Sequence, residues 1–163
     1  DLILKAKWLS RESHYWLQLA MAKIANDRLD DAQNDLKTAY KWANEKQAIR
    51  NYSTSSIDTQ QARLYIKKAI KEQHDKAVWD YFISAHVLLS KCENDKYRYR
   101  QVKEYERFFN LKYNILSVKN KNGFKSCCEH MLSQMKFLSN IDAGEYSIRS
   151  CELSLIRILE KMQ

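Results

Sequence analysis

The sequence predicts an all-α protein built of antiparallel helical hairpins. Its 163 residues include no Pro and only two Gly, Gly123 and Gly144, so the usual markers of turns and strands are nearly absent. Residues that favour helices are abundant, and apolar residues recur at steps of three and four along most of the chain. With 45% hydrophobic residues, the chain is long enough to bury a sizeable core. We expect about seven helices and no β-sheet.

The first predicted hairpin spans about residues 10–44, where two helical patterns flank the sequence NDRLDD. Large and small residues share the facing sides of these helices: Trp16, Leu19, Ala20, Ala32, Leu36 and Ala39. Their order is similar to that of a tetratricopeptide repeat. Ala20, Lys23 and Asn44 replace the Gly, Tyr and Pro common in that repeat, so the pattern predicts an irregular member.

The second predicted hairpin spans about residues 57–91 and follows the Ser- and Thr-rich sequence NYSTSSIDTQ. Asp58 or a neighbouring Ser is a candidate cap for its first helix. The spacing of Val78, Phe82 and Ala85 repeats that of the first hairpin 46 residues later, and Leu89 continues the stripe. A standard tetratricopeptide repeat has about 34 residues, so the array is irregular.

The remaining chain predicts a helix over residues 97–119 and a hairpin over 124–162. Apolar residues of the helix fall on one stripe: Tyr99, Val102, Tyr105, Phe109, Tyr113 and Leu116. The sequence KNKNG, with Gly123, predicts the turn that ends it. The hairpin has two stripes: Phe124, Cys128, Met131, Met135 and Leu138, then Ile148, Cys151, Leu155, Ile158 and Met162. We expect one helical-repeat domain over residues 1–163, and its start without Met predicts a fragment of a longer protein.

Positive charge is concentrated in the middle of the chain. The net charge is +8, and residues 61–125 contain 15 Lys and Arg against 7 Asp and Glu. We predict an exposed basic surface there that steers an acidic protein partner: Lys67, Lys68, Lys71, Arg98, Arg100 and Lys103. The alternating aromatic and basic residues of KYRYR leave nucleic-acid binding as an alternative, which predicts a steep dependence of affinity on salt.

No cluster of residues predicts catalysis, a metal or a cofactor. The cysteines are Cys92, Cys127, Cys128 and Cys151, and their spacing is that of reduced thiols in a cytoplasmic protein. A zinc site of Cys127, Cys128, His130 and Cys151 is disfavoured, because Cys151 would lie roughly 9 Å further along the hairpin than Cys128. Cys128 and Cys151 are expected in the core instead. H-E-x-x-H and Gly-rich phosphate loops are absent, and no apolar run is long enough for a membrane span.

Three successive segments carry a resemblance to a known family: IDTQQARLYIKKAI, AVWDYFISAHVLLS and YRYRQVKEYERFF. Together they resemble the C-terminal helical region of bacterial STAND-type NTPases with a sirtuin-like effector domain. The matching residues are Ile57, Asp58, Ala62, Arg63, Phe82, Ala85, His86, Tyr97, Tyr99 and Arg100. The similarity covers about residues 14–113, and residues 114–163 lie outside it.

The resemblance implies a sensor. In that family the effector and ATPase domains do the chemistry, and the C-terminal repeats recognise an invader's protein and trigger oligomerisation. The chain would then be the protein-binding, non-catalytic portion of a prokaryotic antiviral defence protein. Stacked helical hairpins suit this role because they present an extended surface to a large partner. A plain oligomerisation scaffold is the third hypothesis, and it predicts self-association alone.

Overall fold

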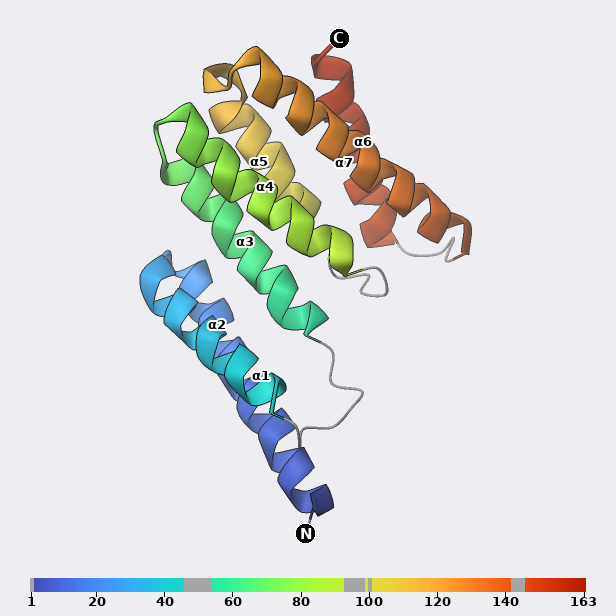
Figure 1. Ribbon diagram of the computed structural model, residues 1–163. Coiled ribbons are helices and arrows are strands. Elements are labelled where there is room, and N and C mark those ends of the chain that lie inside the picture. The colour runs from blue at the N-terminus through green and yellow to red at the C-terminus, as the bar shows by residue number, and fades with distance from the viewer. Residues whose placement is uncertain (1, 46–53, 93–98, 100, 142–145) are drawn as a thin grey trace. The chain divides into compact units, whose positions relative to one another are not determined.

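The computed structural model describes residues 2–45, 54–92, 99, 101–141 and 146–163, and these residues contain helices and no strand (Figure 1). Seven α-helices follow one another in the described residues: α1 (Leu2–Ala25), α2 (Leu29–Ala43), α3 (Ser55–Lys71), α4 (Asp75–Lys91), α5 (Val102–Lys112), α6 (Val118–Ile141) and α7 (Tyr146–Lys161). The 3-10 turn η2 (Tyr113–Ile115) follows α5. The all-α prediction is therefore confirmed for this part of the chain.

The chain divides into two compact units, and the boundary falls within α3, between Leu64 and Tyr65. In the first unit α1 and α2 run antiparallel: Ser13 donates a hydrogen bond to the Ala39 carbonyl (2.9 Å), and Lys23 pairs with Asp35 (2.7 Å). The predicted small and large residues Ala20, Ala32, Leu36 and Ala39 are fully buried, which confirms the facing sides of this hairpin. On α1 the rest of the buried stripe is Leu9, Ser13, Leu17 and Ile24, so Trp16 and Leu19 lie beside it.

A backbone motif ends α1. Asp27 adopts the left-handed conformation with φ of 62°, a region where Asp replaces Gly at modest cost. The N–H of Arg28 donates to the Lys23 carbonyl (2.9 Å) and that of Asp27 to the Ile24 carbonyl (3.1 Å). These two bonds form a Schellman motif, which satisfies the last carbonyls of the helix. The Arg28–Asp31 ion pair (2.6 Å) then lies across the first turn of α2.

Polar side chains join α2 to the first half of α3. Gln33 and Gln61 exchange two hydrogen bonds between their amides, at 2.9 and 2.7 Å. The Tyr40 hydroxyl donates to the Asp58 carboxylate (2.5 Å). Asp58 lies within the first turn of α3, where a carboxylate also favours the helix dipole.

Aromatic rings fill the core of the second unit. The Phe82 ring of α4 lies 4.9 Å from that of Tyr105 and 4.5 Å from that of Phe108, both on α5. It also lies 5.1 Å from the ring of Phe124 on α6. These four side chains are fully buried, so three helices share one aromatic cluster. Lys103 of α5 donates to Ser150 and Ser154 of α7 at 3.3 and 3.2 Å, which places α7 beside α5.

The predicted boundary between helix 97–119 and hairpin 124–162 is wrong. α5 ends at Lys112, and α6 begins at Val118, so Gly123 lies inside a helix rather than in a turn. The chain instead turns at Leu116, which is extended with ψ of 146°. Asp75 fixes this turn by accepting hydrogen bonds from the Ser117 N–H (3.1 Å) and the Asn120 amide (3.2 Å).

Gly123 has a packing role in α6. A Cβ atom at this position would lie 2.7 Å from the Trp79 ring, so the absence of a side chain lets Trp79 lie against α6. The predicted stripe of α5 is also shifted, because Phe108 is fully buried and Phe109 only half-buried. The other predicted core positions that the structure describes on α6 and α7 are buried, except the half-buried Met162: Phe124, Cys128, Met131, Met135, Ile148, Cys151, Leu155 and Ile158.

No helix within the described residues is both long enough and apolar enough to cross a membrane. The arrangement of all the hairpins as one tetratricopeptide-like domain stays a prediction.

Candidate binding surfaces

Among the members of the predicted basic surface that the structure describes, Lys71 and Lys103 are exposed, whereas Lys67 and Lys68 are half-buried. Lys67 was expected to point to solvent, but its side chain is only 15% exposed and pairs with Glu104 at 3.8 Å. Glu104 of α5 supplies this nearby carboxylate, and its own side chain is only 16% exposed. Lys103, the preceding residue on α5, instead contacts the two serines of α7.

Lys68 is half-buried and Lys71 is exposed, both near the end of α3. Arg98 and Arg100, the remaining members of the predicted surface, lie outside the described residues.

The residues that carry the family resemblance belong mostly to the core. Ala62, Phe82, Ala85 and Tyr99 are at most 1% exposed, and His86 is 7% exposed. Asp58 and Arg63 are half-buried; Asp58 accepts from Tyr40, and Arg63 donates to Gln60 of its own helix (3.5 Å). Tyr97 and Arg100 lie outside the described residues. The residues of the shared pattern that the structure describes therefore take part mainly in helix packing. They do not gather around one exposed site.

His86 is the centre of a hydrogen-bond chain that joins the buried Tyr105 to the exposed His130. Its Nδ1 lies 2.7 Å from the Tyr105 hydroxyl, and its Nε2 lies 3.3 Å from Nδ1 of His130. Burial, and then the positive charge that His130 can carry, lower the pKa of His86 to about 4. Burial likewise raises the pKa of the Tyr105 hydroxyl. His86 is thus a neutral, hydrogen-bonded core residue at pH 7.

The thiols are buried among apolar side chains. Cys92, Cys127, Cys128 and Cys151 are free cysteines, and each is buried. Burial raises the pKa of Cys127 to about 12 and also raises that of Cys128, so both remain thiols at neutral pH. The prediction that Cys128 and Cys151 are core residues is confirmed. Within the described residues, no three side chains of the types that bind metals come together.

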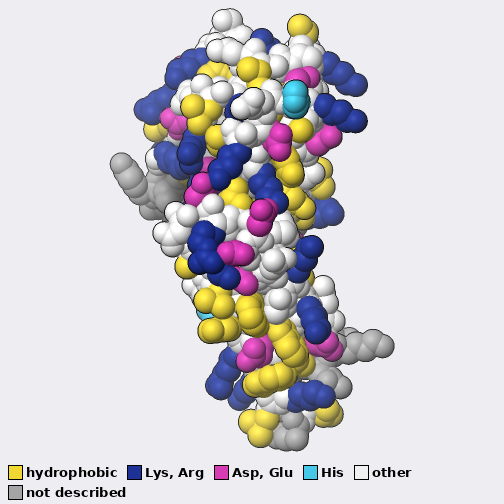
Figure 2. Space-filling model, turned by 90° about the vertical axis from the view of Figure 1, so that its left-hand side faces the viewer, with side chains coloured by type: hydrophobic (Ala, Val, Ile, Leu, Met, Phe, Trp, Pro, Cys, Tyr) yellow, Lys and Arg dark blue, Asp and Glu magenta, His cyan; other side chains and the backbone are white. Residues whose placement is uncertain are grey.

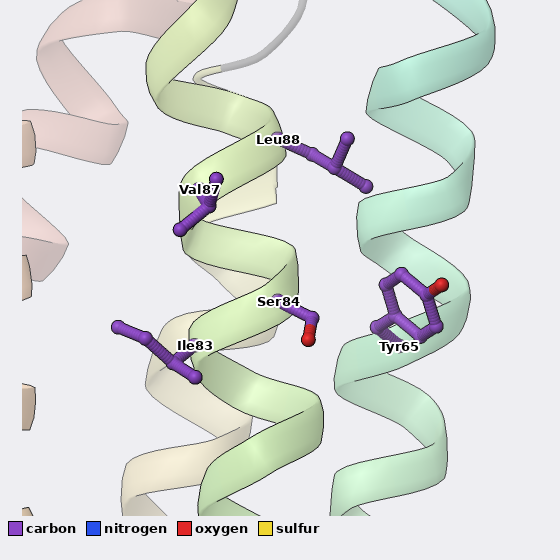
Figure 3. A pocket seen from close by; sticks show the side chains of 5 residues that line it. All are labelled: Tyr65, Ile83, Ser84, Val87 and Leu88. Atoms are coloured by element: carbon purple, nitrogen blue, oxygen red, sulfur yellow. The ribbon is translucent and has the colours of Figure 1, made fainter.

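An open groove lies along α3 and α4 in the second unit. It has a volume of about 340 Å³ and is lined by Tyr65, Ile83, Ser84, Val87 and Leu88. In Figure 3, Ser84 and Leu88 extend from α4 toward Tyr65 of α3, while Ile83 and Val87 follow one another along α4. Ser84 and Val87 are exposed, and the other three side chains are half-buried. The lining combines apolar side chains with the hydroxyl groups of Tyr65 and Ser84.

The sequence did not single out this groove. The detectable signal was on α4, where Ile83 and Val87 are apolar residues four positions apart on a different side from the core stripe Val78–Phe82–Ala85–Leu89. A helix with apolar residues on two sides has more apolar surface than one core contact needs.

The described residues form an all-α helical chain with a groove along α3 and α4. No family model, curated protein or solved structure matches the chain in comparisons of its sequence and fold.

Proposed function

We propose that this chain is a non-catalytic, protein-binding helical module of the irregular tetratricopeptide-like kind. The observation that carries the proposal is the groove lined by Tyr65, Ile83, Ser84, Val87 and Leu88. Its volume of about 340 Å³ is enough for an anchoring apolar side chain of a partner. Val87 is 46% exposed, so part of the apolar lining already faces solvent.

The groove suits a peptide segment better than a polar metabolite. Ile83, Val87 and Leu88 offer apolar contact along α4, in the way that helical grooves hold the apolar face of a partner helix. The hydroxyl groups of Tyr65 and Ser84 are able to hydrogen-bond polar groups at the edge of such a segment. His86, in contrast, is buried and already bonded to Tyr105, which leaves it no role as an exposed base.

The family resemblance adds a biological setting to this module. On that basis we propose that it is the sensor portion of a prokaryotic antiviral defence protein of the STAND type, and that its ligand is an invader's protein. Nucleic-acid binding is less favoured, because Lys67 is only 15% exposed and pairs with Glu104, and the Lys103 ammonium bonds to two serines of α7.

Affinity capture with matched variants tests the proposal. The immobilised chain is exposed to lysates of phage-infected and uninfected bacteria, and bound proteins are compared between wild type, Val87→Glu and Val118→Glu. Val118 is 75% exposed at the start of α6 and serves as the control. We expect a protein that is bound from infected cells, lost with Val87→Glu and kept with Val118→Glu.

A titration with nucleic-acid probes tests the alternative function, nucleic-acid binding. Labelled single- and double-stranded probes are titrated with the same chain at several salt concentrations. Tight binding, with log affinity falling against log salt by about 0.7 to 0.9 per phosphate contact, would replace the proposed function with nucleic-acid binding.

A further inference from the structure

The first half of α1 exposes an unusual number of large apolar side chains. Leu4 is 65% exposed and Trp8 is 49% exposed, and three more are exposed near them: Leu2, Ile3 and Tyr15. They contrast with the buried stripe of the same helix, which runs from Leu9 to Ile24. Figure 2 shows hydrophobic side chains gathered in the lower part of the molecule, where Figure 1 places the start of α1 and the end of α2.

Among the described residues of the first unit, unequal helix lengths leave this surface open. The ring of Trp8 on α1 lies 5.2 Å from that of Trp42, which is next to the last residue of α2. Residues 2–7 of α1 therefore extend beyond the end of α2, by about 9 Å at 1.5 Å per residue. The side chains of this extension have no α2 residues opposite them.

The exposed residues form a stripe with its own charge. Leu4, Trp8 and Tyr15 are four and seven residues apart, so they follow one side of the helix for about 16 Å. Arg11 is exposed and occupies the same stripe between Trp8 and Tyr15, and Lys5 and Lys7 are exposed beside it. At the adjoining end of α2 the Lys41 ammonium lies 5.5 Å from the centre of the Trp42 ring.

Positive charge outweighs negative charge on this surface. Between positions 1 and 15, Lys5, Lys7 and Arg11 outnumber the acidic residues Asp1 and Glu12, and Glu12 is half-buried. An apolar stripe flanked by cations is complementary to an apolar stripe flanked by carboxylates.

We propose that this apolar and basic surface of α1 docks an amphipathic helix of a partner protein whose apolar stripe is flanked by Asp and Glu. Leu4 and Trp8 pack against the apolar stripe, and Lys5, Lys7 and Arg11 face its carboxylates. A second copy of the chain fits less well, because it would set the same three cations against one another. The inference goes beyond the proposed function and uses only residues of the first unit, so it stands or falls apart from the groove on α3 and α4.

A synthetic helix provides the probe. A fluorescein-labelled peptide of about five helical turns carries Leu on one stripe and Glu beside it, and a control peptide carries the same Leu residues with Lys in place of Glu. Each is titrated with the full chain and followed by fluorescence anisotropy. We expect the Glu peptide to bind at least about tenfold more tightly than the Lys peptide.

Variants locate the binding to α1. Leu4→Ser and the pair Lys5→Glu, Lys7→Glu should each weaken binding of the Glu peptide by about tenfold. The controls are Leu111→Ser and Lys125→Glu, which change exposed residues of α5 and α6, and these should stay within about twofold of wild type. Because Leu4 and both lysines are exposed, the variants keep the fold, and their circular dichroism spectra should match that of wild type.

Three results would overturn the inference. The first is equal binding of the Glu and Lys peptides, or equal loss in the α1 and control variants. The second is a dimer in light scattering that Leu4→Ser dissociates, which would assign the surface to a second copy. The third is binding to vesicles of phosphatidylcholine and phosphatidylglycerol that the Glu peptide does not compete, which would assign it to an anionic membrane.

Discussion

The two units pack their helices together with buried side chains of different size. In the first unit Ala20, Ala32 and Ala39 are fully buried, so small residues bring α1 and α2 close together. In the second unit Phe82 and Phe108, with ring centres 4.5 Å apart, fill the space between helices. The first unit thus depends on the closeness of two backbones, and the second on the volume of its rings.

The difference is clearest between two triplets with identical spacing. Ala32–Leu36–Ala39 on α2 corresponds to Val78–Phe82–Ala85 on α4, and all six residues are fully buried. Larger residues replace the first two positions of the second triplet. In the second unit Phe82 contacts rings from both α5 and α6, whereas Leu36 belongs to a two-helix hairpin extended by the start of α3. One repeat pattern therefore supports two kinds of core.

Removing the central ring of the second unit should have the largest effect. Phe82→Ala deletes a side chain that touches Tyr105, Phe108 and Phe124, and we expect a loss of about 3–5 kcal/mol in the free energy of unfolding. Hydrogen exchange should accelerate in α4, α5 and α6 and change little in α1 and α2. Equal acceleration of exchange in both units would show that the two units unfold together. That result would contradict the idea that each unit is stabilised by its own core.

Acid should weaken the second unit through His86. The folded pKa of about 4 lies below the ordinary 6.5, so the unfolded chain binds more protons between these values. Stability is unaffected by this group above pH 6.5 and falls as the pH drops toward 4, by about 3 kcal/mol in total. Urea melts at pH 7 and pH 4.5 measure the loss.

A pair of histidine variants isolates this contribution. His86→Gln should flatten the dependence of stability on pH, whereas His14→Gln, which changes an exposed residue of α1, should leave it unchanged. If the free energy of unfolding falls equally with pH in wild type and His86→Gln, groups other than His86 cause the acid sensitivity.

Overfilling the first unit is the next largest effect. Ala20→Leu adds volume where the hairpin has no space, because Ala20 is fully buried, and we expect a loss of about 1–3 kcal/mol in urea melts. Ala22→Leu changes an exposed residue two positions on and should stay within about 0.5 kcal/mol of wild type. A neutral Ala20→Leu would mean that α1 and α2 are not held at close approach.

The smallest effect concerns Gly123, a position where the second unit also relies on a small residue. Gly123→Ala gains helix propensity, but its Cβ would lie 2.7 Å from Trp79, and we expect a net loss of about 1 kcal/mol. Asn122→Ala, at the exposed neighbouring position of α6, should instead gain about 0.5 kcal/mol. Stabilisation by Gly123→Ala in thermal melts would show that Trp79 moves aside at little cost.

Periodicity predicted the helices and much of the core, because burial on a helix follows spacing. The buried positions Ala20, Ala32, Phe82 and Ala85 were identified in this way, and Cys128 was assigned to the core from its stripe. Gly123 was misread as a turn, since the reason for a glycine there is the Trp79 ring of another helix, 44 positions away in the sequence. Such long-range contacts leave no local pattern.

The binding surfaces were the harder part to predict. The basic surface was inferred from charge counts, but a count does not place Glu104 beside Lys67. The groove depends on which sides of α3 and α4 remain open after the core is packed, and the α1 surface depends on where α2 ends. Each is a property of neighbouring elements rather than of one segment.

The close approach of Trp79 to Gly123 also gives the molecule a built-in optical reporter. The four tryptophans divide unevenly, with Trp8, Trp16 and Trp42 in the first unit and Trp79 in the second. Replacing the first three by Phe would leave one emitter, seated against α6 beside the aromatic cluster. Its emission colour would then follow the hydration of the second unit alone.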